Sequence, residues 1–275
     1  MIQLPEEYPK PEVLEQLVLW QQELERVPDY AQRVSEAKRL FESRNREDNS
    51  TFREIRGTLR TMSGGTQRCV CCEDSLAYQV EHVRPKSLYP EAVFVWKNML
   101  WACGRCNTRK LNRCAIIVGN ELRDVTRRPK DPVVPPPPGK LALIDPVGED
   151  PFSFMILDLA DTFHFVAHPE LKGRIARERV RHTIDDVLGL NDDPLPERRF
   201  GAYSGFRSAL CEIVFGRERG KSETQLAGFR RQLAARDHQT VWREIQRQFK
   251  SDKRSKQLVD DFEELFAAVP DALTW

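Results

Sequence analysis

Four of the seven cysteines stand in two pairs that have the spacing of metal ligands. Each pair encloses two residues, and its members are Cys69 with Cys72 and Cys103 with Cys106. Two pairs of this kind can close a four-thiolate zinc site. Cys71 lies inside the first pair without a partner at this spacing, and the odd number of cysteines argues against a disulfide framework. We therefore predict one structural Zn²⁺ ion.

An acid and a histidine, Glu81 and His82, stand side by side between the cysteine pairs. The alternation in 76–83 predicts a strand that ends before Pro85, and the apolar stretch 93–102 predicts a second one. Residues 105–114, RCNTRKLNRC, contain no Gly or Pro and predict a short basic helix. An imidazole can take a proton from water near neutral pH, and carboxylate or amide oxygens suit a hard divalent cation. The segment therefore predicts a strand, a loop, a second strand and a helix, with zinc clamping the two ends.

The order of these residues resembles the HNH endonuclease motif and its ββα-metal fold. The matching series is Cys69-x2-Cys72, Glu81-His82, Asn98-Met99-Leu100 and Cys103-x2-Cys106-Asn107-x2-Lys110. The resemblance implies a metal-dependent nuclease in which His82 is the general base and Asn98 pins the loop that orients it. It also implies that Glu81 and Asn107 bind the catalytic ion. Glu stands where Asp is common and Asn where His is common, which favours Mg²⁺ or Mn²⁺ over Zn²⁺ or Ni²⁺.

Nucleic-acid binding has to come from local charge, because the net charge of the chain is only +1. The segment 103–130 carries eight basic and two acidic residues, and we expect Arg84, Lys86, Arg109 and Lys110 to contact phosphates. A second basic stretch, 217–256, is interpreted either as another nucleic-acid surface or as the polar side of packed helices. DNA is the expected substrate.

The flanking segments predict a mostly helical α+β fold with a small zinc-clamped nuclease core. We expect an N-terminal helical region at 1–65, the core at 66–128, a proline-rich linker at 129–140, and a C-terminal region at 141–275. The N-terminal helices are expected over 13–27, 34–41 and 51–61. The C-terminal region is expected to begin with short strands at 141–145, 152–157 and 162–166, and to continue with helices at 172–188, 203–215, from Ser222, 241–249 and 256–269.

A narrower resemblance comes from the sequence around the motif. EHVRPK, VWKNMLWACGRCNTRK, LIDPVGEDPFSFMILDL and TIDDVLGLND, with Arg198-Arg199 following, are similar to the HNH subunits of Septu-type anti-phage defence systems. In that family the nuclease works beside an ATPase of the SMC or ABC-like kind, and related pairs serve as retron effectors. The resemblance implies such a partner, which would regulate cleavage.

Several functional classes are disfavoured by the sequence. No apolar run is long enough to span a membrane, and the first residues lack the pattern of a signal peptide, so we expect a cytoplasmic protein without membrane association. No glycine-rich phosphate loop is present, so the chain is not expected to hydrolyse nucleotides itself. Two alternatives remain open: a catalytically inactive zinc-stabilised module that binds nucleic acid or protein, and a restriction-type nuclease with its own target sequence.

Overall fold

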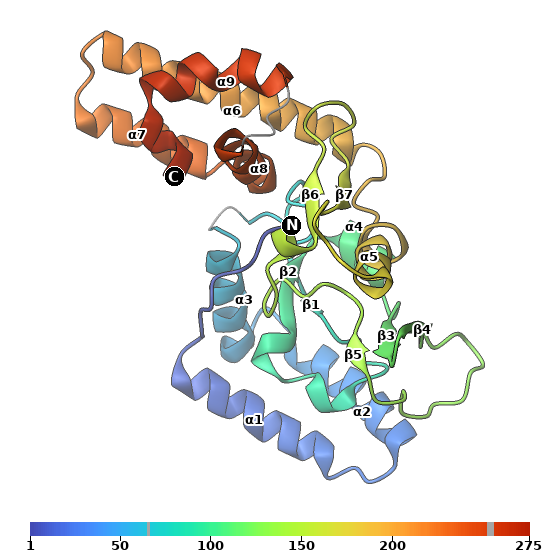
Figure 1. The fold of residues 1–275 in the computed structure, drawn as a ribbon. Helices are drawn as coiled ribbons and strands as arrows, with labels where there is room; N and C mark the ends of the chain where they lie inside the picture. The colour runs from blue at the N-terminus through green and yellow to red at the C-terminus, as the bar shows by residue number, and fades with distance from the viewer. Residues whose placement is uncertain (65–66, 252–255) are drawn as a thin grey trace.

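Helices surround a small two-stranded sheet in the computed structural model, which describes residues 1–64, 67–251 and 256–275 (Figure 1). Short antiparallel sheets lie between the N-terminal helices and a C-terminal helical layer. One continuous apolar core runs from Met1 to Ala272 through these parts. The expected mixed α+β fold, rich in helix, is confirmed. The predicted domain boundaries stay a prediction.

Three N-terminal helices pack around the central hairpin (Figure 1). They are α1 (Pro11–Glu25), α2 (Tyr30–Arg44) and α3 (Ser50–Met62). The side chain of Asp29 accepts a hydrogen bond from the backbone of α2, and that of Asn49 does the same for α3, so both helices begin at polar caps. Their apolar faces are buried, as the helical spacing predicted.

The hairpin that carries the acid and the histidine is formed by β1 (Gln79–His82) and β2 (Met99–Ala102). The strands are antiparallel, with Glu81 opposite Leu100 and His82 opposite Met99. The second strand is shorter than predicted, because a 3-10 turn at Trp96–Asn98 precedes it. The basic helix α4 (Gly104–Lys110) follows at once and ends where Leu111 adopts a φ of +43°.

A second small sheet was not predicted, although its last strand overlaps the start of the strand expected over 141–145. It consists of β3 (Ala115–Val118), β4 (Glu121–Asp124) and β5 (Lys140–Leu141), with β3 in the middle. Residues 129–139, the proline-rich segment, form no helix or strand and return the chain to this sheet. The proline-rich segment thus connects two strands that pair with the same neighbour.

The C-terminal region begins with the predicted hairpin, β6 (Met155–Leu157) and β7 (Phe165–Ala167). The predicted helix over 172–188 is divided into α5 (Arg174–Arg181) and a π-helical segment (His182–Leu188). Gly189 has a φ of +57° and ends this segment, as expected for a glycine in the left-handed region.

The last part of the chain is a helical layer (Figure 1). Its members are α6 (Leu195–Glu218), α7 (Glu223–Ala234), α8 (Gln239–Lys250) and α9 (Lys256–Ala268). The capping box predicted at Ser222 and Gln225 is present. The layer is attached to the segment that carries the first cysteine pair. Glu73, which is buried and directly follows Cys72, accepts hydrogen bonds from the backbone and the hydroxyl of Thr240 in α8.

Candidate active site

The two cysteine pairs meet in one buried cluster. The sulfur atoms of Cys69, Cys72, Cys103 and Cys106 all lie within 4.8 Å of one another. Cys72 Sγ and Cys103 Sγ are 3.9 Å apart, and zinc bound by four thiolates at about 2.3 Å requires sulfur separations of about 3.8 Å. The cluster can therefore hold a structural metal such as zinc.

Backbone hydrogen bonds bring the two pairs together. Val70 N donates to Trp101 O, and Tyr78 N donates to Ala102 O, so the first pair is attached to the strand that leads into the second. Cys106 N also donates to Cys103 Sγ at 3.4 Å, which favours a thiolate at that position. Cys71 is buried but does not belong to the cluster. The four cysteines that cluster are thus those of the two predicted pairs, and their role as zinc ligands stays a prediction.

A pocket of about 300 Å³ is lined by several of the residues that were predicted to form the active site. Its lining includes Glu81, His82 and Asn107, together with Lys86. The first two come from β1 and the third from α4. Neighbouring strand residues normally face opposite sides of a sheet, but His82 is the last residue of β1 and both side chains reach this pocket. The fold therefore brings together three residues for which the HNH resemblance implies a chemical role.

His82 is held in one orientation by its surroundings. Its Nε2 lies 2.9 Å from the carbonyl oxygen of Val93, and because a carbonyl only accepts, Nε2 carries the proton and Nδ1 is left as the basic nitrogen. The ring of Phe41 packs against the imidazole at 4.7 Å. Burial lowers the pKa of His82 well below its usual range, and the charges of Lys86 and Lys110 lower it further. The imidazole is therefore neutral at pH 7, which is the form able to accept a proton.

Asn98 is buried and fixes the loop that follows His82. Its Oδ1 accepts a hydrogen bond from Arg84 N at 2.7 Å. Its Nδ2 donates to Ala92 O at 2.8 Å and to Arg84 O at 3.2 Å. Because Val93, which binds His82, directly follows Ala92, these bonds connect Asn98 to the orientation of the imidazole. This geometry matches the loop-pinning role that the resemblance implied.

Glu81 forms an ion pair that the sequence did not reveal. Lys110 Nζ lies 2.9 Å from Glu81 Oε1, and the two side chains are only 2% and 8% exposed. Within the described residues, Glu81 Oε1 accepts a hydrogen bond from Lys110, and Glu81 Oε2 accepts none. On α4, Asn107 Nδ2 donates to Gln79 Oε1 at 2.7 Å, and the amide oxygen of Asn107 has no partner in the described part of the chain. Oxygen atoms of Glu81 and Asn107 therefore remain for a hard cation.

The four residues expected to contact phosphates lie in four different surroundings. Lys86 faces the pocket, with its Nζ 3.5 Å from His82 Nδ1. Lys110 is buried in its ion pair with Glu81. Arg109 Nη1 pairs with Asp192 at 2.8 Å and its Nη2 donates to Asp185 O, which attaches α4 to the π-helical segment and to the turn that follows it. Arg84 stacks over the ring of Tyr89 and lines a separate pocket on the other side of its loop.

The pocket also contains residues that were not predicted from the sequence. Lys38 on α2 lines it, as do Ser87 and Asn112. Ser87 and Asn112 lie within or next to the motif region, so their proximity could have been suspected. Lys38 lies more than forty residues before His82 in a helix interpreted as ordinary packing, and no local pattern connects the two.

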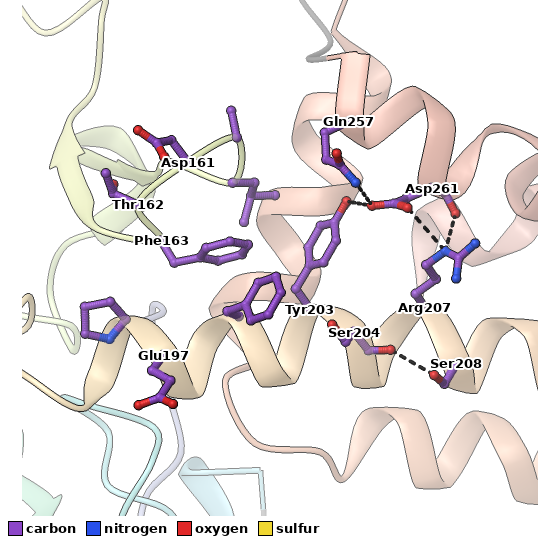
Figure 2. Close-up of a pocket in the computed structure, with 14 residues that line it drawn as sticks. Asp161, Thr162, Phe163, Glu197, Tyr203, Ser204, Arg207, Ser208, Gln257 and Asp261 are labelled. Atoms are coloured by element: carbon purple, nitrogen blue, oxygen red, sulfur yellow. Dashed lines mark hydrogen bonds and ion pairs between the residues drawn. The ribbon is translucent and has the colours of Figure 1, made fainter.

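A larger pocket of about 750 Å³ lies elsewhere, between the β6–β7 turn, α6 and α9 (Figure 2). Its lining contains no histidine, cysteine or lysine. Its polar groups largely bind one another: Asp261 Oδ2 accepts from the hydroxyl of Tyr203 at 2.8 Å and from Gln257 at 2.7 Å, and Arg207 contacts the same acid (Figure 2). The larger pocket thus contains none of the residues for which the HNH resemblance implies a chemical role, and the smaller one is the candidate site.

Comparison with known proteins gives a distant match to a curated protein. No protein-family model matches the chain. A curated protein, Septu protein PtuB from Bacillus thuringiensis, is 32% identical over 82 residues. The matched part covers 28% of this chain and 32% of PtuB, so the chain matches about a third of that relative's length. Within the described residues, no helix combines the length and apolar character needed to cross a bilayer.

Proposed function

We propose that this chain is a metal-dependent HNH-type endonuclease that hydrolyses phosphodiester bonds, with DNA as its substrate. The observation that carries the proposal is the orientation of His82: its Nε2 is engaged by Val93, and its neutral Nδ1 lies in a pocket with Glu81 and Asn107. The spacing of these residues matches the HNH motif, and the cysteine cluster beside them supports the same interpretation.

In the proposed reaction His82 Nδ1 takes a proton from the attacking water while Nε2 stays bound to the Val93 carbonyl. Asn98 holds the loop that fixes this orientation. Lys86 places a positive charge beside the imidazole, where it can hold a substrate phosphate. A Mg²⁺ or Mn²⁺ ion held by Glu81 and Asn107 would stabilise negative charge on the phosphate and on the leaving oxygen.

The biological setting we propose is anti-phage defence. Support comes from the distant similarity to Septu protein PtuB and from the Septu-like sequence around the motif. By the same resemblance, the nuclease would act beside an ATPase of the SMC or ABC-like kind. Co-purification of this chain with such an ATPase encoded next to it would test the partnership, and separate elution at all salt concentrations would contradict it.

The test of the nuclease proposal is plasmid nicking by the purified chain with Mg²⁺ or Mn²⁺ and without either ion. His82→Ala should reduce cleavage by roughly two to four orders of magnitude, because a general base contributes that much. His164→Ala, which changes a histidine outside the pocket, is the matched control and should cleave like wild type. Equal zinc content in all three proteins would show that the cluster is intact. Undiminished cleavage by His82→Ala would refute the assigned base.

An inactive binding module is the second candidate, and the Glu81–Lys110 ion pair favours it. A carboxylate already neutralised by a buried ammonium group is a weaker ligand for a cation than a free one. Titration calorimetry with Mn²⁺ on wild type and on Asn107→Ala distinguishes the two. Binding that depends on Asn107 supports the nuclease, whereas no binding in the presence or absence of DNA supports the inactive module.

A further inference from the structure

We infer that α2 forms one wall of the nucleic-acid-binding pocket and that the ammonium group of Lys38 contacts a backbone phosphate of the substrate. The inference deepens the proposed function and rests on it for the identity of the substrate. It assigns a substrate-binding role to a helix whose sequence shows only the pattern of a packing helix.

The position of α2 relative to the site is fixed by its own side chains. The ring of Phe41 packs against the imidazole of His82 at 4.7 Å, and Lys86 Nζ lies 4.5 Å from the centre of the same ring. At the other end of the helix, the hydroxyl of Tyr30 donates to the carbonyl of Leu88 at 2.9 Å. Both ends of α2 are thereby attached to the segment 82–88, which forms the site.

Lys38 lies on the face of α2 that these contacts direct toward the pocket. It precedes Phe41 by three residues, so the two side chains are neighbours on the helix surface. Lys38 is exposed, lines the pocket and forms no ion pair within the described residues. Glu42, which lies four residues after Lys38, forms no ion pair with Lys38 within the described residues. Arg39, the next residue, instead pairs with Glu36 at 2.6 Å.

The charge in the pocket suits an anion. Glu81 supplies the one carboxylate in the lining, and Lys110 already neutralises it. The positive charges of Lys38 and Lys86 are therefore left without an acidic partner in the lining. The hydroxyl oxygen of Ser87, another lining residue, is buried and has no hydrogen-bond partner in the described protein. A phosphodiester, with its negative charge and several acceptor oxygens, matches this lining.

A contact between Lys38 and a phosphate predicts how the affinity for DNA depends on salt. A lysine that contacts a phosphate strengthens binding independently of base sequence, and its loss lowers the salt dependence of the affinity. Lys38→Gln should therefore reduce the slope of log Kd against log salt by about 1 and weaken binding at low salt. Lys38→Arg should restore both. Arg39→Gln removes the same charge from the adjacent position on the same helix and should change neither.

The experiment uses the full-length chain without added Mg²⁺ or Mn²⁺, so that the DNA is not cut and the contact between His82 and Phe41 is kept. It measures binding of a fluorescein-labelled DNA duplex by anisotropy at several salt concentrations. A reduced slope for Lys38→Gln but not for Arg39→Gln supports the proposal. Equal slopes for the two, or no binding of the duplex by the parent protein, overturn it. Failure of the nuclease proposal has a separate signature: a chain with an intact His82 that binds the duplex but does not cut it with Mg²⁺.

Discussion

Replacing Lys110 with methionine tests whether the buried ion pair with Glu81 organises the site. Methionine keeps nearly the same length and volume, so the loss of packing should be small. The ammonium group is lost, however, and Glu81, whose side chain is 8% exposed, is left without its counter-ion. Removing one partner of a buried ion pair costs about 3–5 kcal/mol, and we expect Lys110→Met to lower the free energy of unfolding by this amount at neutral pH.

The assay is urea unfolding followed by tryptophan fluorescence in the presence of zinc, with wild type and variants compared at the same pH. Lys97→Met makes the same substitution in an exposed pair with Glu6 and should leave the unfolding midpoint unchanged. The double variant Glu81→Gln with Lys110→Met should recover more than half of the loss, because no buried charge remains. If Lys110→Met unfolds at the same urea concentration as wild type at neutral pH, the ion pair does not stabilise the site and the reasoning is wrong.

Three other perturbations address the cluster, the base and the loop. Cys103→Ser should release zinc, whereas Cys71→Ser should retain one equivalent by mass spectrometry, since Cys71 lies outside the cluster; equal zinc contents would contradict the four-ligand set. Burial lowers the pKa of His82, so its neutral form persists as the pH falls below 6.5. The cleavage rate should therefore stay level just below pH 6.5 and decline only at lower pH. A decline centred at pH 6.5 or above would be inconsistent with His82 as the base. Asn98→Ala removes three hydrogen bonds to the loop and should cost roughly 2–4 kcal/mol in urea unfolding, with a larger loss of cleavage; a fully stable variant would show that the loop is held by other contacts.

The parts of the site that could be predicted are those determined by short spacings. Two residues between paired cysteines and the adjacency of Glu81 and His82 are local constraints, so the cysteine cluster and two residues of the pocket were accessible from the sequence. The N-terminal helices were accessible for the same reason, because their apolar spacing and their polar caps act within a few residues.

The surroundings of the charged residues could not be predicted in this way. Arg109 and Lys110 are neighbours in α4, and successive residues of a helix point about 100° apart, so one reaches Asp192 and the other turns inward to Glu81. Which of them is buried depends on what packs against the helix, not on its charge pattern. Lys38 is a stronger case, because contacts between residues far apart in the sequence, such as Phe41 on His82 and Tyr30 with Leu88, place it beside the pocket.

The missed hairpin β3–β4 is different, because a signal was present. Gly119 and Asn120 follow the strand-forming run Ala115–Val118, and a Gly-Asn pair is a recognised turn between paired strands, although the second strand, Glu121–Asp124, is mostly charged. The same segment also contributes to a basic run, and the charge pattern was interpreted instead of the turn. Gly119 has a φ of +58°, which shows why glycine is suitable at this turn.

The location of the cysteine cluster determines which experiments can test the chemistry. Cys106 directly precedes Asn107 in α4, and backbone hydrogen bonds attach the first cysteine pair to β2, the partner of the strand that carries Glu81 and His82. Loss of zinc should therefore displace the pocket residues as well as unfold the cluster. Inactivity of a cysteine variant would be expected for a nuclease and for a binding module alike. Substitutions in the pocket that leave the zinc content unchanged, such as His82→Ala, separate the two.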